Sequence, residues 1–408
     1  MIPRRWSKSG APATDTPVRR RPSLDFSVTG LIYVTMMLFM GLAALNSQAS
    51  LLFGVFGLMI GVVLISGVIS RMVLRKLEIR RHLPDLAVVG QPTTIQYEFI
   101  NRKRFWPSLS VTVGELSVSE GFTKQPQAYL LHAAARTHAT VPMQVVPKRR
   151  GLHHFDRYQL STSFPFGFIK RAITLRQPET ILVHPPLADV DPKLLSMATS
   201  AEIAGARMRP RRGGTDEFFG VKEFRHGENP RWIYWRRSAR TGTLVAKEMT
   251  HVAPPRLLVL LDTCVGSKGT REEHAAVERA IAMAASLVNR AVDQGLAIGL
   301  YVWSGNWTMV PPSRGKRHAR DLMSHLAQLP LNTEHGRREL LENGRALLRT
   351  GTTAILITPR DLEQNLSDQV RGRTIVVNSG TDHYKRYFRF DPAIDFSLCM
   401  PPDQQPKA

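Results

Sequence analysis

The longest uncharged segment of the chain runs from Thr29 to Ser70 and contains no Asp, Glu, Lys, Arg or His. It is too long for one transmembrane helix, which needs about 20 apolar residues. The small and polar residues 46–50 divide it into two halves, 30–45 and 51–69. At about 1.5 Å per residue, each half spans roughly the hydrocarbon thickness of a bilayer. Because backbone groups in lipid must be hydrogen-bonded internally, we predict two transmembrane helices within residues 29–70, joined as a tight hairpin.

Basic residues flank this hairpin on both sides, whereas its turn is uncharged. The flanking basic residues are Arg4, Arg5, Lys8, Arg19, Arg20 and Arg21 before it, and Arg71, Arg75, Lys76, Arg80 and Arg81 after it. Positive flanks favour the cytoplasmic side, so we expect a multi-pass chain with both termini and all soluble domains inside. A cleaved signal peptide is the competing interpretation. It is disfavoured because the apolar stretch starts late, is double and lacks a small-residue cleavage site.

The hairpin itself is expected to be a tether. Charged residues within spans mark transport paths and proton relays, and these spans have none. Gly57 and Gly61 form a GxxxG pattern that could mediate dimerisation or let the two helices of the hairpin approach closely. The second interpretation is favoured. Residues 1–28, rich in Arg, Pro and Ser, are predicted to be a disordered basic tail.

Residues 75–186 have a different pattern. Short alternating or β-branched runs, such as 93–100 and 109–113, are separated by turn residues. Regular short strands with few helical stretches predict an antiparallel, β-sandwich-like module. No paired carboxylates or nucleophile motif occurs here, so we expect this module to mediate contacts or spacing.

The charge of the whole chain limits its partners. Its formal charge is +22, from 55 basic and 33 acidic residues, which favours anionic lipid headgroups, nucleic acid or an acidic protein surface as partners. The favoured interpretation is simpler: the positive-inside bias of a membrane protein together with a solvated basic surface. Only two cysteines are present, Cys264 and Cys399. They form neither a disulfide framework nor a CxxC metal motif and fit a reducing compartment.

The most distinctive segment, residues 207–248, mixes basic and aromatic residues and lies in a region, 187–250, that we predict to be a linker plus a motif. Asn229 and Pro230 predict the start of a short helix over 231–240, with Gly242 ending it and a strand following. The residues predicted to pack inward are Trp232, Trp235 and Ala239, and those predicted to form a cationic stripe are Arg236 and Arg240. Stacking of nucleic-acid bases is the alternative. It is disfavoured because the aromatic residues are at core spacing and acidic residues are interspersed.

Strands and helices alternate in the C-terminal region, residues 255–400. Apolar strands are predicted at 257–261, 297–303, 353–358 and 374–377, and helices at 272–294, 316–329 and 336–349. Buried apolar strands alternating with helices predict a doubly wound α/β fold with a mostly parallel sheet. Functional loops in such sheets follow the carboxyl ends of strands, where Asp262 and Asp361 are placed.

Taken together, these features resemble the domain-of-unknown-function-58 family of bacterial membrane proteins. The resemblance covers the helix hairpin, the turn at 148–151, the Phe-Pro-Phe-Gly step at 164–167 and the 207–248 segment. The candidate signature or partner-binding residues are Glu217, Phe218, Gly227, Glu228, Pro230, Arg231, Trp235, Ser238, Ala239 and Arg240. The resemblance implies a location in the bacterial inner membrane, a C-terminal von Willebrand factor A-like domain and a MoxR-type AAA+ ATPase as partner.

The von Willebrand factor A-like superfamily binds metal at a motif that begins Asp-x-Ser-x-Ser. The corresponding residues here are Asp262, Cys264 and Gly266, so two hydroxyl ligands are missing. Mg²⁺ requires near-octahedral oxygen coordination. Asp262, Ser267 and Asp361 are the candidate ligands of a degenerate site, but a metal-free fold is favoured, and no cofactor is expected.

Three functions follow from these observations. The favoured one is a non-enzymatic, membrane-anchored adaptor or scaffold that presents its α/β domain to a cytoplasmic protein, with the ATPase in chaperone-like assembly as the implied partner. The second is a basic-surface module for anionic lipid or nucleic acid, although no nucleic acid is expected as a partner. The third is a metal-dependent hydrolase that uses Asp262 and Asp361. It is disfavoured because no Ser-His-Asp, HExxH or paired-glutamate pattern supports it.

Overall fold

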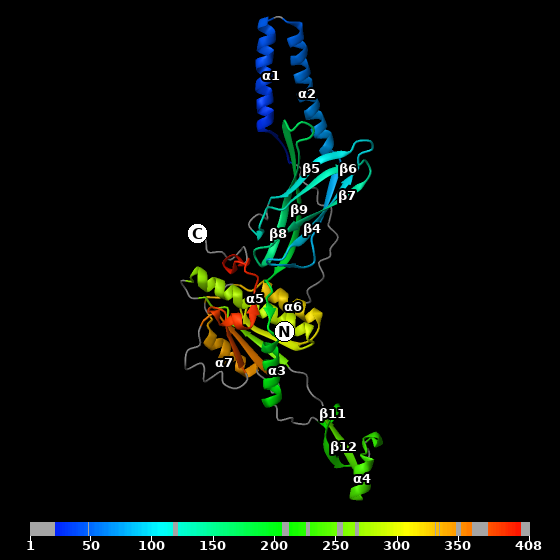
Figure 1. The fold of residues 1–408 in the computed structure, drawn as a ribbon, viewed down its shortest axis with the longest axis vertical. Coiled ribbons are helices and arrows are strands. Elements are labelled where there is room, and N and C mark those ends of the chain that lie inside the picture. Colours follow the sequence, from blue (N-terminus) through cyan, green and yellow to red (C-terminus); the bar gives the residue numbers. More distant parts are fainter. Residues whose placement is uncertain are drawn as a thin grey trace. The chain divides into compact units, whose positions relative to one another are not determined.

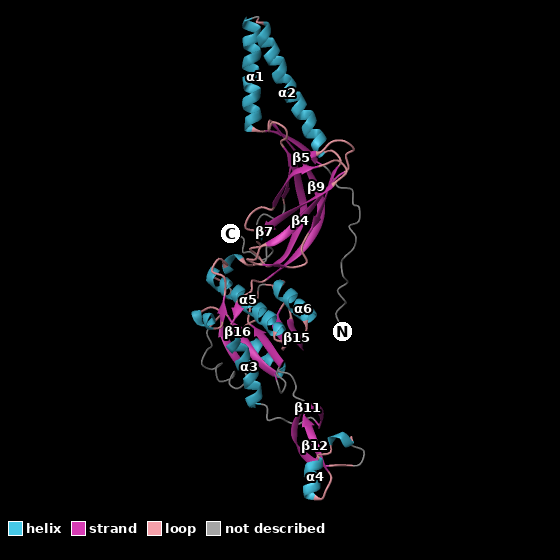
Figure 2. Ribbon diagram, turned by 45° about the vertical axis from the view of Figure 1, so that its right-hand side comes forward, coloured by secondary structure: helices cyan, strands magenta, loops and turns pink. Residues whose placement is uncertain are grey.

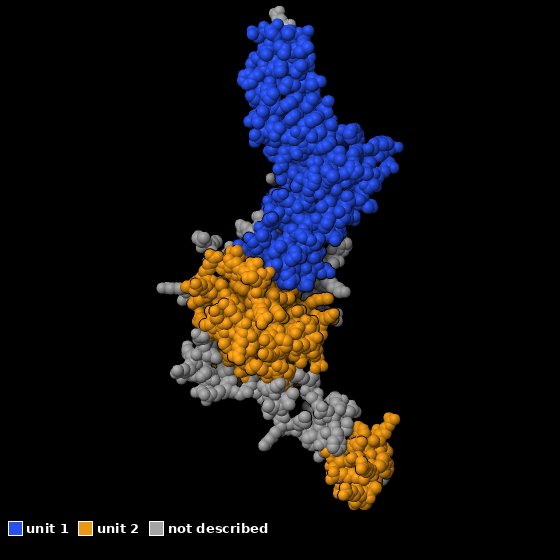
Figure 3. All heavy atoms as spheres, viewed as in Figure 1, with its two compact units in different colours: residues 1–183 blue, residues 184–408 orange. Residues whose placement is uncertain are grey.

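The structure is a computed structural model that forms two compact units, residues 1–183 and 184–408 (Figure 3). It describes residues 21–47, 49–116, 121–205, 212–225, 229–250, 256–265, 269–330, 332–333, 335–347, 352–360 and 374–400. Each unit has a buried core of its own.

The first unit contains the helix hairpin, α1 (Val28–Ser47) and α2 (Ser50–Leu74) (Figure 1). By length and composition both helices could cross a membrane. Only 17% of the most apolar 18-residue segment of α1, and 11% of that of α2, is buried. A core helix of a soluble protein would be mostly buried, whereas most of the apolar surface of these two helices is exposed among the described residues. Both helices are longer than the predicted spans, because helical structure continues into the flanking residues, in α2 past Arg71.

The two helices are in tight contact at a glycine that the sequence analysis did not single out. A Cβ atom added to Gly41 would lie 2.8 Å from the ring of Phe56, so a larger residue there would force the Phe56 ring to shift. At Gly57 and Gly61 an added Cβ would have no neighbour within 4 Å. The favoured interpretation of the GxxxG pattern, close approach within the hairpin, is therefore wrong. Dimerisation through it stays a prediction.

Ordered structure also begins earlier than predicted. Residues 21–26, expected to belong to a disordered tail, form β1 (Arg21–Phe26). This strand pairs antiparallel with β9 (Ile169–His184), from Arg21 opposite Thr174 to Phe26 opposite Ile169. Main-chain hydrogen bonds to β9 order a segment whose composition alone would leave it unfolded. Residues 1–20 lie outside the described residues.

The remainder of the first unit is rich in antiparallel strands (Figure 2). In order these are β2 Leu77–His82, β3 Ala87–Val88, β4 Thr93–Asn101, β5 Ser108–Glu115, β6 Gln127–Ala133, β7 His138–Val145 and β8 Gly151–Thr162. One sheet has the order β1-β9-β8-β5-β6, with β3 also on β9, and the other has the order β2-β4-β7. The predicted sheet-rich module is confirmed at this level. Its classification as a sandwich stays a prediction.

Side chains from both sheets meet in one interior. Along β4, residues alternate between buried and exposed or half-buried, which places Ile95, Tyr97 and Phe99 inside. Arg81 of β2 is also buried, and its guanidinium contacts Glu115 of β5 and Glu179 of β9, each at 2.9 Å. Arg81 therefore joins the two sheets and does not act as a solvent-exposed flank of the hairpin.

The second unit is built on a five-stranded sheet with the order β15-β14-β13-β16-β17. Its strands are β13 Arg256–Leu261, β14 Ala297–Trp303, β15 Trp307–Ser313, β16 Thr352–Thr358 and β17 Thr374–Asn378. The main helices are α5 Arg271–Asp293, α6 Lys316–Ala327 and α7 Arg337–Leu347, and the short 3₁₀ helices are η3 Asp382–Arg386 and η4 Phe396–Leu398. Three strand pairs are parallel and only β14–β15 is antiparallel. The predicted mostly parallel sheet is confirmed.

Helices cover both faces of this sheet. Leu257, Val259 and Leu261 of β13 pack in one core cluster with residues of α5 and α6. Leu258 and Leu260, on the opposite face, pack with Leu340 and Leu341 of α7. Every residue of β13 after the first is buried, which explains its uninterrupted apolar sequence.

Part of the predicted linker belongs to this α/β domain. β10 (Asp189–Val190) pairs with β18 (Phe388–Arg389), and α3 (Pro192–Gly205) contributes Leu194 and Leu195 to the core. The Thr353 hydroxyl on β16 donates to the Ala198 carbonyl at 2.9 Å. The prediction of a linker from residue 187 was wrong here, because pairing with a strand some 200 residues later leaves no local sequence pattern.

Candidate functional site

The signature segment folds as a hairpin of two antiparallel strands, β11 (Arg212–Glu223) and β12 (Val245–Thr250). The predicted helix between them is split into a 3₁₀ turn, η2 (Pro230–Trp232), and α4 (Trp235–Thr241). Its predicted ends are confirmed. The Asn229 side chain accepts from the Arg231 amide at 3.1 Å, and Gly242 adopts φ +71°, the left-handed conformation that glycine tolerates best.

Ser238 fixes α4 against β12. Its hydroxyl accepts a hydrogen bond from the Val245 amide at 2.9 Å and donates to the Tyr234 carbonyl at 3.1 Å. Ser238 is buried, as is Ile233, which forms an isolated bridge with Ala246. Ile233 and Ser238 are therefore the inward-facing side chains of this segment.

The prediction that Trp235 and Ala239 pack inward was wrong. The Trp235 side chain is 65% exposed, and Ala239 is exposed too. The prediction assumed one continuous helix, but the helix is interrupted at Ile233 and Tyr234, so Trp232 and Trp235 do not follow a single helical spacing. Three exposed arginines lie on the same short helix as Trp235, namely Arg236, Arg237 and Arg240. We call Trp235, Arg236, Arg237 and Arg240 the α4 patch.

The other signature residues are distributed along the hairpin. Glu217 and Phe218 lie in β11 opposite Thr250 and Met249. Pro230 and Arg231 are exposed in η2. Gly227 and Glu228 lie outside the described residues.

The candidate metal residue Asp262 directly follows β13 at the carboxyl edge of the sheet. It is buried, and its Oδ2 accepts from the Thr358 hydroxyl at 2.9 Å while Oδ1 accepts from the Cys264 amide at 3.1 Å. Each carboxylate oxygen thus already holds a protein donor. The other two candidates, Ser267 and Asp361, lie outside the described residues. Within the parts of the chain that the structure describes, no group of three or more His, Cys, Asp or Glu residues could hold a metal ion.

Cys264, beside Asp262, is not activated. Burial, reinforced by the Asp262 carboxylate, raises the pKa of the Cys264 thiol. The neutral thiol is a poor nucleophile and a poor metal ligand, since both roles need the thiolate.

Sequence reasoning missed the polar residues that complete this edge. The Ser379 hydroxyl donates to the Ala276 carbonyl at 2.7 Å. The Asn332 side chain donates to the His335 carbonyl at 2.8 Å and accepts from the His335 amide at 3.0 Å. The Asn332 carbonyl accepts from the Val265 amide at 2.8 Å. Thr358, Asn332 and Ser379 thus tie strand ends and loops together. Thr358 ends β16 and Ser379 directly follows β17, so their place at the carboxyl ends of apolar strands was the signal that could have identified them. Asn332 lies between α6 and α7 and had no such signal.

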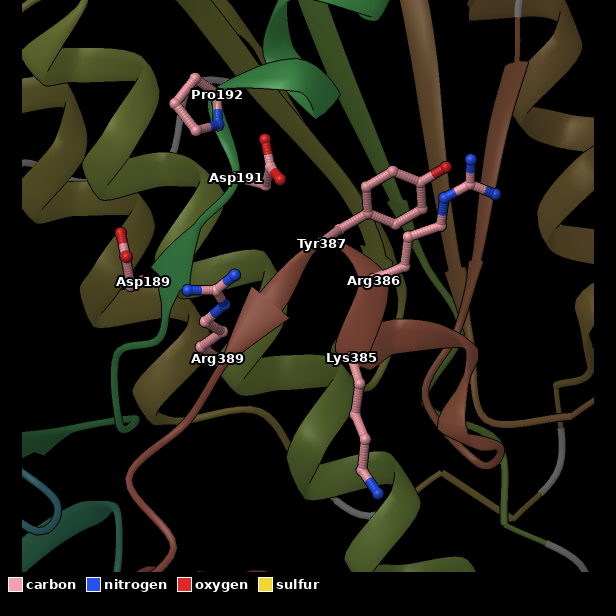
Figure 4. Close-up of a pocket in the computed structure, with 7 residues that line it drawn as sticks. All are labelled: Asp189, Asp191, Pro192, Lys385, Arg386, Tyr387 and Arg389. Carbon is pink, nitrogen blue, oxygen red and sulfur yellow. The ribbon is translucent and has the colours of Figure 1, made fainter.

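A shallow pocket of about 150 Å³ lies beside the β10–β18 pair (Figure 4). The side chains that line it are Asp189, Asp191, Pro192, Lys385, Arg386, Tyr387 and Arg389. Some of these groups have structural partners, since Asp191 accepts from the Lys193 amide at 2.8 Å and Lys385 pairs with Asp382 at 2.6 Å. The mixture of both charge signs favours no single ligand class.

If Asp262 has a structural role, its replacement should weaken the fold. We expect Asp262→Ala to lower the free energy of unfolding by about 1–3 kcal/mol, since the Thr358 hydroxyl and the Cys264 amide lose their acceptor in a buried site. Denaturant titration of the purified chain in detergent measures this. The matched control is Asp391→Ala, which removes an exposed carboxylate that also accepts a backbone amide, at 2.9 Å, and which water can replace. Unchanged stability with loss of Mg²⁺ binding would instead indicate a metal site.

Comparison with known proteins finds one family model that matches part of the chain. Residues 220–376, from β11 to β17, match the family model described as protein of unknown function DUF58. The chain is also similar to the uncharacterized protein YeaD of Bacillus subtilis (strain 168), with 21% identity over 188 residues. That alignment covers 46% of this chain and 45% of YeaD. The region matched by the family model contains both the α4 patch and Asp262, and the two comparisons together support the DUF58 family for this part of the chain.

Proposed function

We propose that this chain is a membrane-anchored, non-enzymatic adaptor that presents the α4 patch and its α/β domain to a cytoplasmic protein. The observation that carries the proposal is the exposed Trp235 among three exposed arginines on a helix fixed by Ser238. Tryptophan and arginine are the residues most enriched at interface hot spots. A rigid support lowers the conformational entropy lost when such side chains bind.

The α4 patch also defines the chemistry of the partner. Its three arginines complement an acidic surface, and the tryptophan fits an apolar pocket within that surface. The family resemblance adds a MoxR-type AAA+ ATPase as the partner to test first, with chaperone-like assembly of other proteins as the process.

A non-enzymatic role is supported by the arrangement at the carboxyl edge of the sheet. Asp262 holds hydrogen bonds from Thr358 and Cys264, and Cys264 has a raised thiol pKa. These residues stabilise the strand ends, and the proposed function needs no metal there.

Membrane anchoring is the second part of the proposal. We propose that α1 and α2 span the bacterial inner membrane, with both termini and both soluble regions in the cytoplasm. The support is the length and apolar surface of the helices together with the basic residues that flank them.

This topology predicts complete protection from external protease. In intact spheroplasts, added protease should leave the chain at full length, because only a few residues around Ala49 face outward. After lysis with detergent the soluble regions should be cleaved. Fragments from intact spheroplasts would show that a soluble region lies outside.

A basic-surface module for anionic lipid or nucleic acid is the second candidate, supported by the same arginines. Salt distinguishes the two proposals. Binding to phosphates falls steeply with salt through counterion release. An interface centred on Trp235 would retain most of its affinity.

A further inference from the structure

Two loops of the β-rich module meet the ends of the helix hairpin. The loop between β4 and β5 carries Lys103, whose ammonium donates to the carbonyls of Met72 and Val73 in the last turn of α2, at 3.1 and 2.8 Å. Burial lowers the pKa of Lys103 to about 8. The group is therefore still mostly charged at neutral pH and satisfies the free carbonyls at the end of this helix.

The loop between β8 and β9 makes equivalent contacts. Ser70 of α2 donates to the Phe164 carbonyl at 2.8 Å. Ser27, whose hydroxyl accepts from the Gly30 amide at 3.0 Å and so caps α1, also donates to the carbonyls of Gly167 and Phe168. The Tyr33 ring of α1 stacks on Phe168 with centroids 4.3 Å apart. These loops are thus held beside the start of α1 and the end of α2.

Large aromatic side chains project from this level into solvent. Phe105, Trp106 and Phe166, from the two loops, and Phe26, directly before α1, have between 50% and 76% of their surface exposed. We call these four residues the aromatic collar. Exposed basic residues accompany them, namely Arg71, Arg75, Arg104 and Lys170. The Arg104 guanidinium lies 5.0 Å from the Phe105 ring centroid.

We propose that the aromatic collar is a membrane-interface surface that inserts into the headgroup region of the leaflet in which α1 and α2 end. The inference rests on the proposed membrane anchoring. Aromatic side chains, tryptophan above all, are enriched at this depth, and basic side chains beside them attract anionic headgroups. The hydrogen bonds from Lys103, Ser70 and Ser27 fix the collar beside the helix ends. The collar would therefore hold the β-rich module against the bilayer and would fix its tilt.

Quenching of tryptophan emission by brominated lipids tests this inference on the full-length protein in nanodiscs that contain anionic lipid. Lipids brominated near the carbonyl should quench a larger fraction of the tryptophan emission of the wild type than of Trp106→Phe. The reason is that Trp106 is the tryptophan expected to lie at this depth, and the variant lacks it. The control adds Leu152→Trp to the Trp106→Phe protein. Leu152 is exposed at the start of β8, which runs about 33 Å before it reaches the collar loop. This reporter should not be quenched.

A further variant distinguishes an error in this inference from an error in the proposed membrane anchoring. Leu38→Trp, added to the Trp106→Phe protein, places a reporter at an exposed site midway along α1. It should be quenched by lipid brominated deep in the acyl chain. Quenching at Leu38→Trp but no Trp106-dependent quenching would overturn the collar and leave the anchor standing, so that the exposed aromatics would await a protein partner or a second copy. No quenching at Leu38→Trp would overturn both.

Discussion

Replacing Glu115 with alanine is expected to destabilise the β-rich module by about 3–5 kcal/mol, because it leaves the guanidinium of Arg81 buried without its main carboxylate. Both side chains are fully buried, 2.9 Å apart. Tyr97 also donates to Glu115, at 2.8 Å. Burial lowers the pKa of Arg81, but its two carboxylate partners outweigh this effect and the net pKa is raised, so the guanidinium stays charged. Denaturant titration followed by circular dichroism measures the loss.

A nearby exposed ion pair supplies the control. Arg102 and Glu78 lie 2.8 Å apart at the other end of β2, but both are largely in solvent. Glu78→Ala should therefore cost at most about 1 kcal/mol. The double replacement Arg81→Leu with Glu115→Leu should recover part of the stability lost in Glu115→Ala, since it removes both buried charges of this pair and leaves neither Arg81 nor Glu115 unpaired. If Glu115→Ala were no more destabilising than Glu78→Ala, the account of this interior would be wrong.

The second large effect is expected at the α4 patch. Trp235→Ala should weaken binding of the partner at least about 30-fold, which corresponds to a hot-spot loss of about 2 kcal/mol or more. Folding should be preserved, because the Trp235 side chain is mostly exposed. Arg236→Glu should also weaken binding, with a stronger dependence on salt. Titration of the partner against the full-length chain in nanodiscs gives both values.

Charge reversal elsewhere on the same hairpin is the matched control. Arg225 is exposed after β11 and is not part of the α4 patch, so Arg225→Glu should leave the affinity nearly unchanged. Equal losses in Arg225→Glu and Arg236→Glu would mean that net charge, and not this surface, governs binding. That result would favour the lipid or nucleic-acid alternative.

The parts of the fold that the sequence predicts well are those set by local chemistry. The absence of charge over 29–70 locates both long helices, because charge is costly in lipid. The uninterrupted apolar run of β13 identifies a strand buried on both faces. Asn229 and Gly242 mark the ends of the η2–α4 segment through conformational preferences of their own.

The parts that the sequence missed depend on contacts between distant residues. Arg81 is one of several basic residues after the hairpin, and nothing local shows that Glu115 and Glu179 draw it into the interior. Trp235 has the spacing of a core residue, but the bridge from Ile233 to Ala246 turns α4 so that Ser238 faces inward. The role of Thr358 could not be predicted locally, because its hydroxyl reaches Asp262 only through the pairing of β16 with β13. In each case tertiary structure decides which face of a local pattern is buried.

Purification of the intact chain in mild detergent, with and without Mg²⁺, tests the adaptor proposal most directly. The proteins that co-purify are identified by mass spectrometry, and Trp235→Ala is purified in parallel. The proposal predicts that a AAA+ ATPase co-purifies with the wild type under both conditions and is lost with Trp235→Ala. Absence of any AAA+ ATPase with the wild type under either condition would contradict it.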